Sequence, residues 1–158
     1  MMGPDMKVAV DSSVLVGLIN PLDHRRLQAM GLHDALIAAG VELIYFDCVV
    51  AEAVSVVVRR LEEKKRSEEV KAMLDSLNLQ VPEDTISWIL PDVPKLFKQV
   101  LGIIRSSSGA LNFNDALIAL ACRERGIEAI ASFDPDFDQI PWLRRLSLPE
   151  DLDVKRKK

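Results

Sequence analysis

The sequence contains few of the residues that form disulfides, zinc sites or membrane spans. Its two cysteines, Cys48 and Cys122, share no short motif, so we expect both to be reduced, buried packing residues. Its two histidines, His24 and His33, form no recognisable metal motif either. No apolar run is long enough to cross a bilayer, and residues 1–7 carry no basic segment followed by an apolar stretch. We therefore expect a cytoplasmic protein without a secretory signal or a membrane partner.

Aromatic residues are scarce at 5%, whereas hydrophobic residues make up 49% of the chain. This composition excludes a disordered chain and predicts a core of aliphatic side chains. A length of 158 residues suits one compact domain. We expect that domain to span residues 6–148 and to be followed by a basic tail at 149–158.

Basic residues are not in excess, because 20 Lys and Arg stand against 24 Asp and Glu, for a net charge of −4. A protein that coats nucleic acid through charge alone is expected to be basic, so that class is excluded. The net charge does not exclude an enzyme that gathers acidic residues around a metal ion. The candidates for contacting RNA phosphates are the clustered basic residues, Arg59 and Arg60 first, then Lys64, Lys65, Arg66, Arg144, Arg145 and the tail. Alternatively, the first cluster only complements a helix dipole.

Short apolar segments alternate with longer amphipathic ones along the chain. The pattern predicts strands at 7–10, 41–46 and 127–131, and helices at 12–19, 22–39, 49–66, 67–77, 95–105 and 116–125. Because of its prolines, we expect the segment 82–94 to be a loop with a brief irregular part, and 142–146 to begin a final short element. Such alternation is typical of an α/β fold, here a three-layer α/β/α sandwich around a central, mostly parallel sheet.

Four acidic residues stand at element ends or in apolar surroundings. Asp11 directly follows the first strand, and Asp134 follows the strand at 127–131. Asp115 opens one apolar helix, and Glu52 lies inside another. Because functional side chains in open α/β sheets gather beyond the carboxyl ends of strands, these acids can face one crevice. Converging carboxylates repel unless a cation lies among them, and hard oxygen ligands favour Mg²⁺ or Mn²⁺. The chemistry typical of such a site is metal-assisted phosphodiester hydrolysis.

Each acid also has an ordinary structural interpretation. Asp11 and Asp115 can cap the helices that follow them. Glu52 can be a solvent-facing helix residue, and the segment 134–138, with three aspartates, can be a plain acidic turn. The metal-site hypothesis therefore rests on the four acids together.

Over roughly residues 7–146, the chain resembles the PIN-domain nucleases, in particular the small VapC-like toxin type. The resemblance rests on VAVDSS at 8–13, Glu52 in its Val/Ala-rich helix, NFNDA at 112–116 and ASFDPDF at 131–137. The family commonly has threonine near the first and before the last aspartate, where this chain has serine.

The resemblance implies a catalytic and metal-binding quartet of Asp11, Glu52, Asp115 and Asp134. It further implies that Ser13 and Ser132 orient acids, metal or phosphate. Asp136 is an added acid in the last loop, and we expect it to bind a second ion through water. The resemblance also implies pairing into a homodimer, which the apolar helix at 116–121 independently suggests because a small fold has little room to bury it.

These observations predict a Mg²⁺- or Mn²⁺-dependent ribonuclease, the toxin of a toxin–antitoxin pair with RNA as substrate and a cognate antitoxin as partner. The alternative from another class is a non-catalytic PIN-like RNA-binding or assembly module. A phosphatase of the haloacid-dehalogenase type is discounted because it needs a second aspartate where Ser13 stands. A dinucleotide-binding fold is discounted because the turn after the first strand has no glycines.

Overall fold

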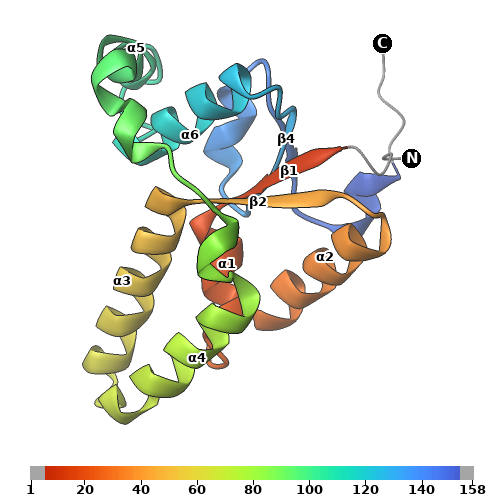
Figure 1. The fold of residues 1–158 in the computed structure, drawn as a ribbon, viewed down its shortest axis with the longest axis vertical. Helices are drawn as coiled ribbons and strands as arrows, with labels where there is room; N and C mark the ends of the chain where they lie inside the picture. The colour runs from red at the N-terminus through yellow and green to blue at the C-terminus, as the bar shows by residue number, and fades with distance from the viewer. Residues whose placement is uncertain (1–5, 154–158) are drawn as a thin grey trace.

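The computed structural model describes residues 6–153. Its centre is a five-stranded sheet in the order β3-β2-β1-β4-β5, and every neighbouring pair of strands is parallel (Figure 1). The strands are β1 (Lys7–Val10), β2 (Glu42–Phe46), β3 (Ile86–Ser87), β4 (Ala129–Ala131) and β5 (Arg144–Leu146). Parallel strands must be joined by crossover connections, which in this chain are mostly helices.

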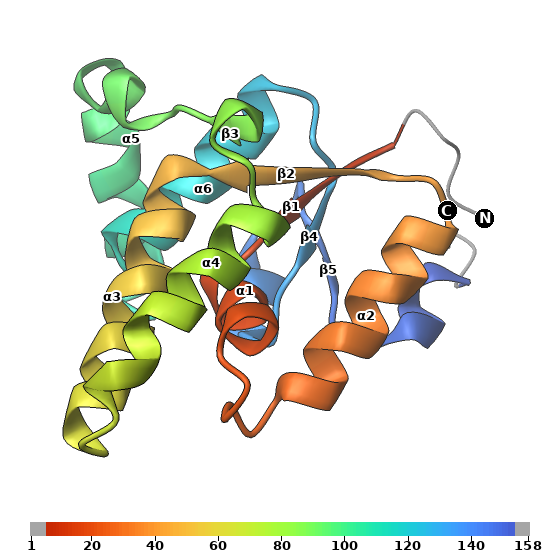
Figure 2. The same cartoon turned by 60° about the horizontal axis from the view of Figure 1, so that its bottom comes forward.

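Helices cover both faces of the sheet. The helices are α1 (Ser12–Ile19), α2 (Arg26–Ala38), α3 (Asp47–Glu63), α4 (Val70–Gln80), α5 (Val93–Ser106) and α6 (Phe113–Glu124). The first four pack with one another on one face, whereas α5 and α6 pack together on the other (Figures 1 and 2). The predicted three-layer α/β/α sandwich is therefore confirmed. No helix within residues 6–153 is long and apolar enough to cross a membrane.

The order of the strands contains a topological switch point beside β1. From β1 the chain builds β2 and β3 on one side, and it then crosses to build β4 and β5 on the other. In the β1–β4 register, Val10 lies opposite Ala131, so Asp11 and Ser132 leave neighbouring strands at the same edge. In open α/β sheets this is the edge where ligands bind.

The core is almost entirely aliphatic, as the low aromatic content predicted. The three residues of β4 and the last three of β1 are buried, and Phe46 and Phe137 are the aromatic residues among the largest fully buried side chains. Among the described residues, five polar or charged residues are buried as a whole: Asp11, Asn20, Asp47, Asp115 and Ser132. Four of the five stand just beyond a strand or at the start of a helix, where function or backbone hydrogen bonding can offset the cost of burial.

Several predicted boundaries shift by a few residues, and two predictions between residues 20 and 94 were wrong. The second helix was expected from residue 22 but begins at Arg26. The preceding turns are held by the side chains of Asn20, which accepts from the Leu22 N–H, and Asp23, which accepts from the Arg25 N–H. Such side-chain-to-backbone bonds give the chain an alternative to helix. The segment 82–94 was expected to be a loop, yet it contains β3, whose two residues pair with the end of β2.

The end of the domain also differs from the expectation. Residues 149–152 were assigned to the tail, but they form a short 3-10 helix, η5 (Pro149–Leu152), that packs on α2 and buries Leu152 (Figure 2). Burying the Leu152 side chain removes apolar surface from water, which favours packing of this segment on the domain. The basic residues of the predicted tail lie outside the described residues, as do residues 1–5.

Candidate active site

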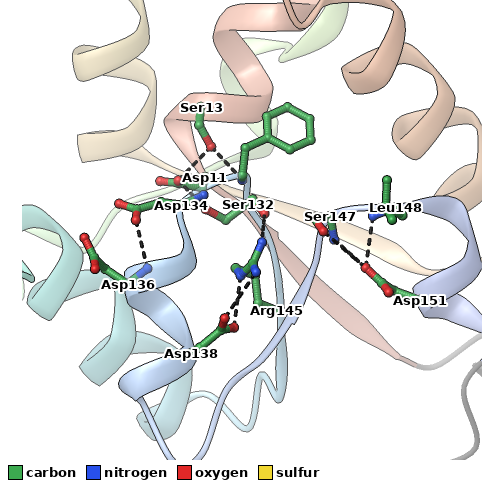
Figure 3. A network of polar contacts seen from close by, with 11 residues as sticks. Asp11, Ser13, Ser132, Asp134, Asp136, Asp138, Arg145, Ser147, Leu148 and Asp151 are labelled. Carbon is green, nitrogen blue, oxygen red and sulfur yellow. Dashed lines mark hydrogen bonds and ion pairs between the residues drawn. The ribbon is translucent and has the colours of Figure 1, made fainter.

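Asp11 is buried at the carboxyl end of β1, with 4% of its surface exposed. Its Oδ2 accepts hydrogen bonds from the hydroxyls of Ser13 at 2.9 Å and Ser132 at 2.7 Å (Figure 3). Although Asp11 occupies the N-cap position of α1, its side chain makes no capping hydrogen bond. Burial raises the pKa of Asp11 above its ordinary value, while the two serine hydroxyls oppose the rise. The capping interpretation therefore does not explain this carboxylate.

The two serines also bind the loop that follows β4. The Ser13 hydroxyl accepts the N–H of Phe133 at 3.1 Å, and the Ser132 hydroxyl accepts the N–H of Asp134 at 3.0 Å. Each hydroxyl thus donates to Asp11 and accepts from the backbone, which fixes its proton on the Asp11 side. This arrangement ties the end of β1 to the loop that carries Asp134.

Asp134 begins a 3-10 helix, η4 (Pro135–Gln139), and its Oδ1 accepts the N–H of Asp136 at 2.9 Å (Figure 3). The interpretation of this segment as an acidic turn is therefore correct for its local geometry. The negative charge of Asp134 raises the pKa of Asp136. Asp136 thus lies close enough to Asp134 to share its electrostatic environment.

Asp115 is the third residue of α6 and completes a capping box with Asn112. Asn112 Oδ1 accepts the Asp115 N–H at 2.9 Å, and Asp115 Oδ2 accepts the Asn112 N–H at 3.2 Å. The capping role that the sequence left open is therefore present. It does not account for the electrostatics, because burial raises the pKa of Asp115 to about 7 and the charges of Asp11, Asp134 and Glu52 add to the rise.

Glu52 lies on α3, half-buried rather than facing solvent freely. Burial raises its pKa, and the neighbouring charge of Asp11 adds to the rise. A hydrogen bond from the Ser12 side chain acts in the opposite direction. Ser12 and Ser13 therefore support two different acids, Glu52 and Asp11, from consecutive positions at the start of α1.

The four predicted acids thus form one electrostatic cluster although they come from four separate segments. Asp115 is repelled by all three of the others, and Asp11 is also repelled by Asp134. Their donor atoms are hard carboxylate oxygens, which suit Mg²⁺ or Mn²⁺. Within residues 6–153 no three His, Cys, Asp or Glu side chains are grouped tightly enough to hold a metal ion by themselves. A cation in this cluster would complete its shell with water, as Mg²⁺ commonly does.

The basic residues expected to bind RNA differ in whether they already form ion pairs or hydrogen bonds within the protein. Arg145 makes a two-pronged contact with Asp138 at 3.0 and 3.1 Å and donates to the Ser132 carbonyl at 3.3 Å (Figure 3). Arg144 donates to the backbone carbonyl of Asp151. Arg145 therefore braces the loop after β4, and Arg144 braces η5. A role for them in binding RNA has no support in this geometry.

The cluster on α3 is different. Arg59 is exposed, whereas Arg60 pairs with Asp23 at 2.8 Å and lines the same pocket as Glu52. Of the two arginines expected to bind substrate, Arg60 is thus the one that lines a pocket together with an acid of the cluster.

Asp47 is a buried acid whose full role the sequence did not reveal. It begins α3 and accepts the Cys48 N–H at 2.9 Å. It also accepts the N–H groups of Ile89 at 3.1 Å and Leu90 at 3.0 Å, which fastens the segment after β3 to the start of α3. The available signal was an acid directly after an apolar strand, the same signal that singled out Asp11.

Comparison with known proteins identifies the family. A family model of the PIN domain matches residues 8–143, so the chain belongs to the PIN-domain family. The crystal structure of Mycobacterium tuberculosis VapC20, described as a sarcin-ricin loop cleaving toxin, is similar with a TM-score of 0.61. The two chains are 21% identical, and the match covers 85% of this chain and 95% of VapC20, so the likeness concerns the fold. A search of curated protein sequences found no match.

Proposed function

We propose that this chain is a divalent-metal-dependent endoribonuclease. The observation that carries the proposal is the cluster of Asp11, Glu52, Asp115 and Asp134 at the switch point of the sheet, where each shifted pKa is raised by burial and by at least one other member. Such mutual repulsion is costly in a structural role. A bound cation would remove it.

The four acids would hold Mg²⁺ or Mn²⁺, with Asp136 contacting a second ion through water. Bound there, the metal supplies an activated water and stabilises the charge that develops on the phosphate and the leaving oxygen. Ser13 and Ser132 keep Asp11 oriented and hold the Asp134 loop in place, and the Asn112 cap fixes the position of Asp115. Side chains that are already oriented lose less conformational entropy when metal and substrate bind.

The finer proposal is that the substrate is single-stranded or loop RNA and that the chain is the toxin of a toxin–antitoxin pair in the cytoplasm. VapC20, which shares the fold, is described as a sarcin-ricin loop cleaving toxin. A cognate antitoxin belongs to this proposal.

A homodimer also belongs to this proposal. The family resemblance implies it, whereas the apolar helix at 116–121 no longer supports it, because α6 is buried within the single chain. The exposed apolar pair Phe97 and Leu101 on α5 gives a further support.

The competing function is a non-catalytic PIN-like RNA-binding or assembly module. The observation in its favour is that no three potential ligands within residues 6–153 are already grouped for a metal ion. The two functions differ in whether the protein cleaves RNA when a divalent metal ion is present.

The test is incubation of the purified protein with defined RNAs that contain single-stranded and loop segments, in Mg²⁺, in Mn²⁺ and in EDTA. We expect cleavage with either ion and none in EDTA. Protein carrying Asp134→Asn, purified in the same way, controls for contaminating nucleases and should cleave far more slowly. Binding of intact RNA without cleavage in either ion would favour the non-catalytic module, and full activity in EDTA would exclude a metal-dependent reaction.

A further inference from the structure

A pocket of about 240 Å³ adjoins the acidic centre. Its polar lining consists of Glu52, the two serines at the start of α1, and a group of charged and ring side chains, Asp23, His24, Arg25 and Arg60. Val16 and Val56 contribute apolar surface to the same pocket. Its volume is below the roughly 300–1,000 Å³ typical of sites for drug-sized ligands, so it suits a small unit such as one sugar and base.

Arg60 is held in a fixed position by a buried partner. Its Nη1 lies 2.8 Å from Oδ1 of Asp23, whose side chain is only 4% exposed. The other oxygen of Asp23 accepts the Arg25 N–H at 3.0 Å, so the carboxylate is itself oriented by the backbone. The Arg60 side chain stays 41% exposed and therefore accessible from the pocket. An arginine pre-positioned in this way loses less side-chain entropy when it binds an anion.

Arg25 is fixed by a different contact. Its guanidinium lies over the ring of Phe133, 4.9 Å from the ring centroid. Phe133 stands between Ser132 and Asp134, and its N–H is bound by Ser13. The second cation of the pocket is thus packed on the loop that carries an acid of the metal cluster. Cation–π packing leaves the edge of the guanidinium able to donate hydrogen bonds.

On the α3 side of the pocket, the acidic group and the basic group are well separated. Glu52 and Arg60 lie on the same helix, eight residues and about 12 Å apart. An RNA strand whose scissile phosphate is held by metal at the acidic end presents its next phosphate away from that metal. Arg60 and Arg25, with His24 and Asp23 beside them in the same pocket, supply the positive charge that such a phosphate requires.

We propose that this pocket is a nucleotide subsite, in which Arg60 and Arg25 bind the RNA phosphate next to the scissile one and Val16 and Val56 contact the sugar and base. The proposal rests on the nuclease function proposed above, because that function places the scissile phosphate at the acids. Within the basic cluster of α3, it assigns the substrate contact to Arg60, and Asp23 is the residue that positions it.

The test compares Arg60→Gln with Lys98→Gln, which removes the same charge from an exposed position on α5 outside the pocket. Binding of a short fluorescein-labelled single-stranded RNA is measured by anisotropy in EDTA, so that no cleavage occurs. Arg60→Gln should weaken binding about tenfold and reduce the slope of log affinity against log salt by about 1. Lys98→Gln should stay close to wild type. With Mg²⁺, Arg60→Gln should raise KM and leave kcat nearly unchanged.

A further variant guards against a folding defect, since Arg60→Gln leaves the buried Asp23 without its ion pair. The double variant Asp23→Asn/Arg60→Gln removes that stranded charge and keeps an acceptor for the turn, and it should show the same loss of binding. Adenosine monophosphate should in addition shift the methyl resonances of Val16 and Val56 in the wild type.

The subsite and the nuclease can fail separately. If the wild type cleaves RNA but Arg60→Gln keeps wild-type affinity and KM, the subsite is wrong and the nuclease stands. If the wild type cuts no RNA in any metal but Arg60→Gln loses binding in EDTA while the control does not, the subsite stands and the nuclease is wrong.

Discussion

Asp115→Asn is expected to lower the turnover number for RNA cleavage at least about a hundredfold, or about 2.7 kcal/mol of transition-state stabilisation. Asparagine keeps an oxygen that can accept the Asn112 N–H, so the capping box and the start of α6 should survive. What the substitution removes is one of the four charges that place the cation. The loss should therefore appear in kcat, measured with saturating RNA and Mg²⁺.

The matched control is Asp75→Asn, which neutralises an exposed aspartate on α4. It should retain wild-type turnover. Far-ultraviolet circular dichroism and the melting temperature should show that Asp115→Asn is folded. A folded Asp115→Asn protein with wild-type turnover would contradict a catalytic role for this acid and leave it as a helix cap.

Asp47→Ala is expected to lower the free energy of unfolding by about 3 kcal/mol or more. The carboxylate accepts three backbone N–H groups, and two of them, those of Ile89 and Leu90, come from a segment about forty residues further along the chain. Alanine leaves these donors without their acceptor, and the Ile89 N–H is buried. For a domain of this size the melting temperature should fall by roughly 10 °C.

Asp75→Ala serves as the control, because it truncates an exposed aspartate inside a helix and should be close to neutral. Urea unfolding followed by circular dichroism measures both variants. A change below 1 kcal/mol for Asp47→Ala would mean that water replaces the carboxylate and that the segment after β3 is held by its apolar contacts.

The sequence predicted the layers of the fold and the nearness of Asp11 to Asp134 for one physical reason. Apolar strands that alternate with helices produce a parallel sheet, and parallel strands bring their carboxyl ends to one edge. Asp11 and Asp134, which follow different strands, therefore had to lie near each other. Asp115 and Glu52 do not follow strands, and they were included because one opens an apolar helix and the other lies inside one.

The features that the sequence did not predict depend on contacts between distant residues. Two residues of β3 are too few to show a strand period, and their pairing with β2 depends on the Asp47 bonds to the following segment. Charge alone could not distinguish Arg145, which is engaged by Asp138, from Arg60, whose partner leaves it facing a pocket. The burial of α6 likewise requires knowing that α5 packs beside it.

The raised pKa of Asp115 predicts how the stability of the folded protein depends on pH. Asp115 has a pKa of about 7 in the folded protein against an ordinary value of 3.8, so the folded state prefers the protonated form. In EDTA, this residue should therefore make the protein less stable as the pH rises from about 4 to about 7. The penalty persists above that window. Asp115→Asn should abolish this component, so at neutral pH it should be as stable as the wild type or more stable.

The measurement that tests the account most directly is a melting series of the wild type, Asp11→Asn, Glu52→Gln, Asp115→Asn and Asp134→Asn, in EDTA and in millimolar Mg²⁺. Mg²⁺ should raise the melting temperature of the wild type, because it binds the folded state, and should raise that of every variant less. In EDTA, Asp134→Asn should equal or exceed the wild type, since it relieves repulsion on Asp11 and Asp115. A wild type that Mg²⁺ does not stabilise, with four variants that behave independently, would show that these acids do not form one metal site.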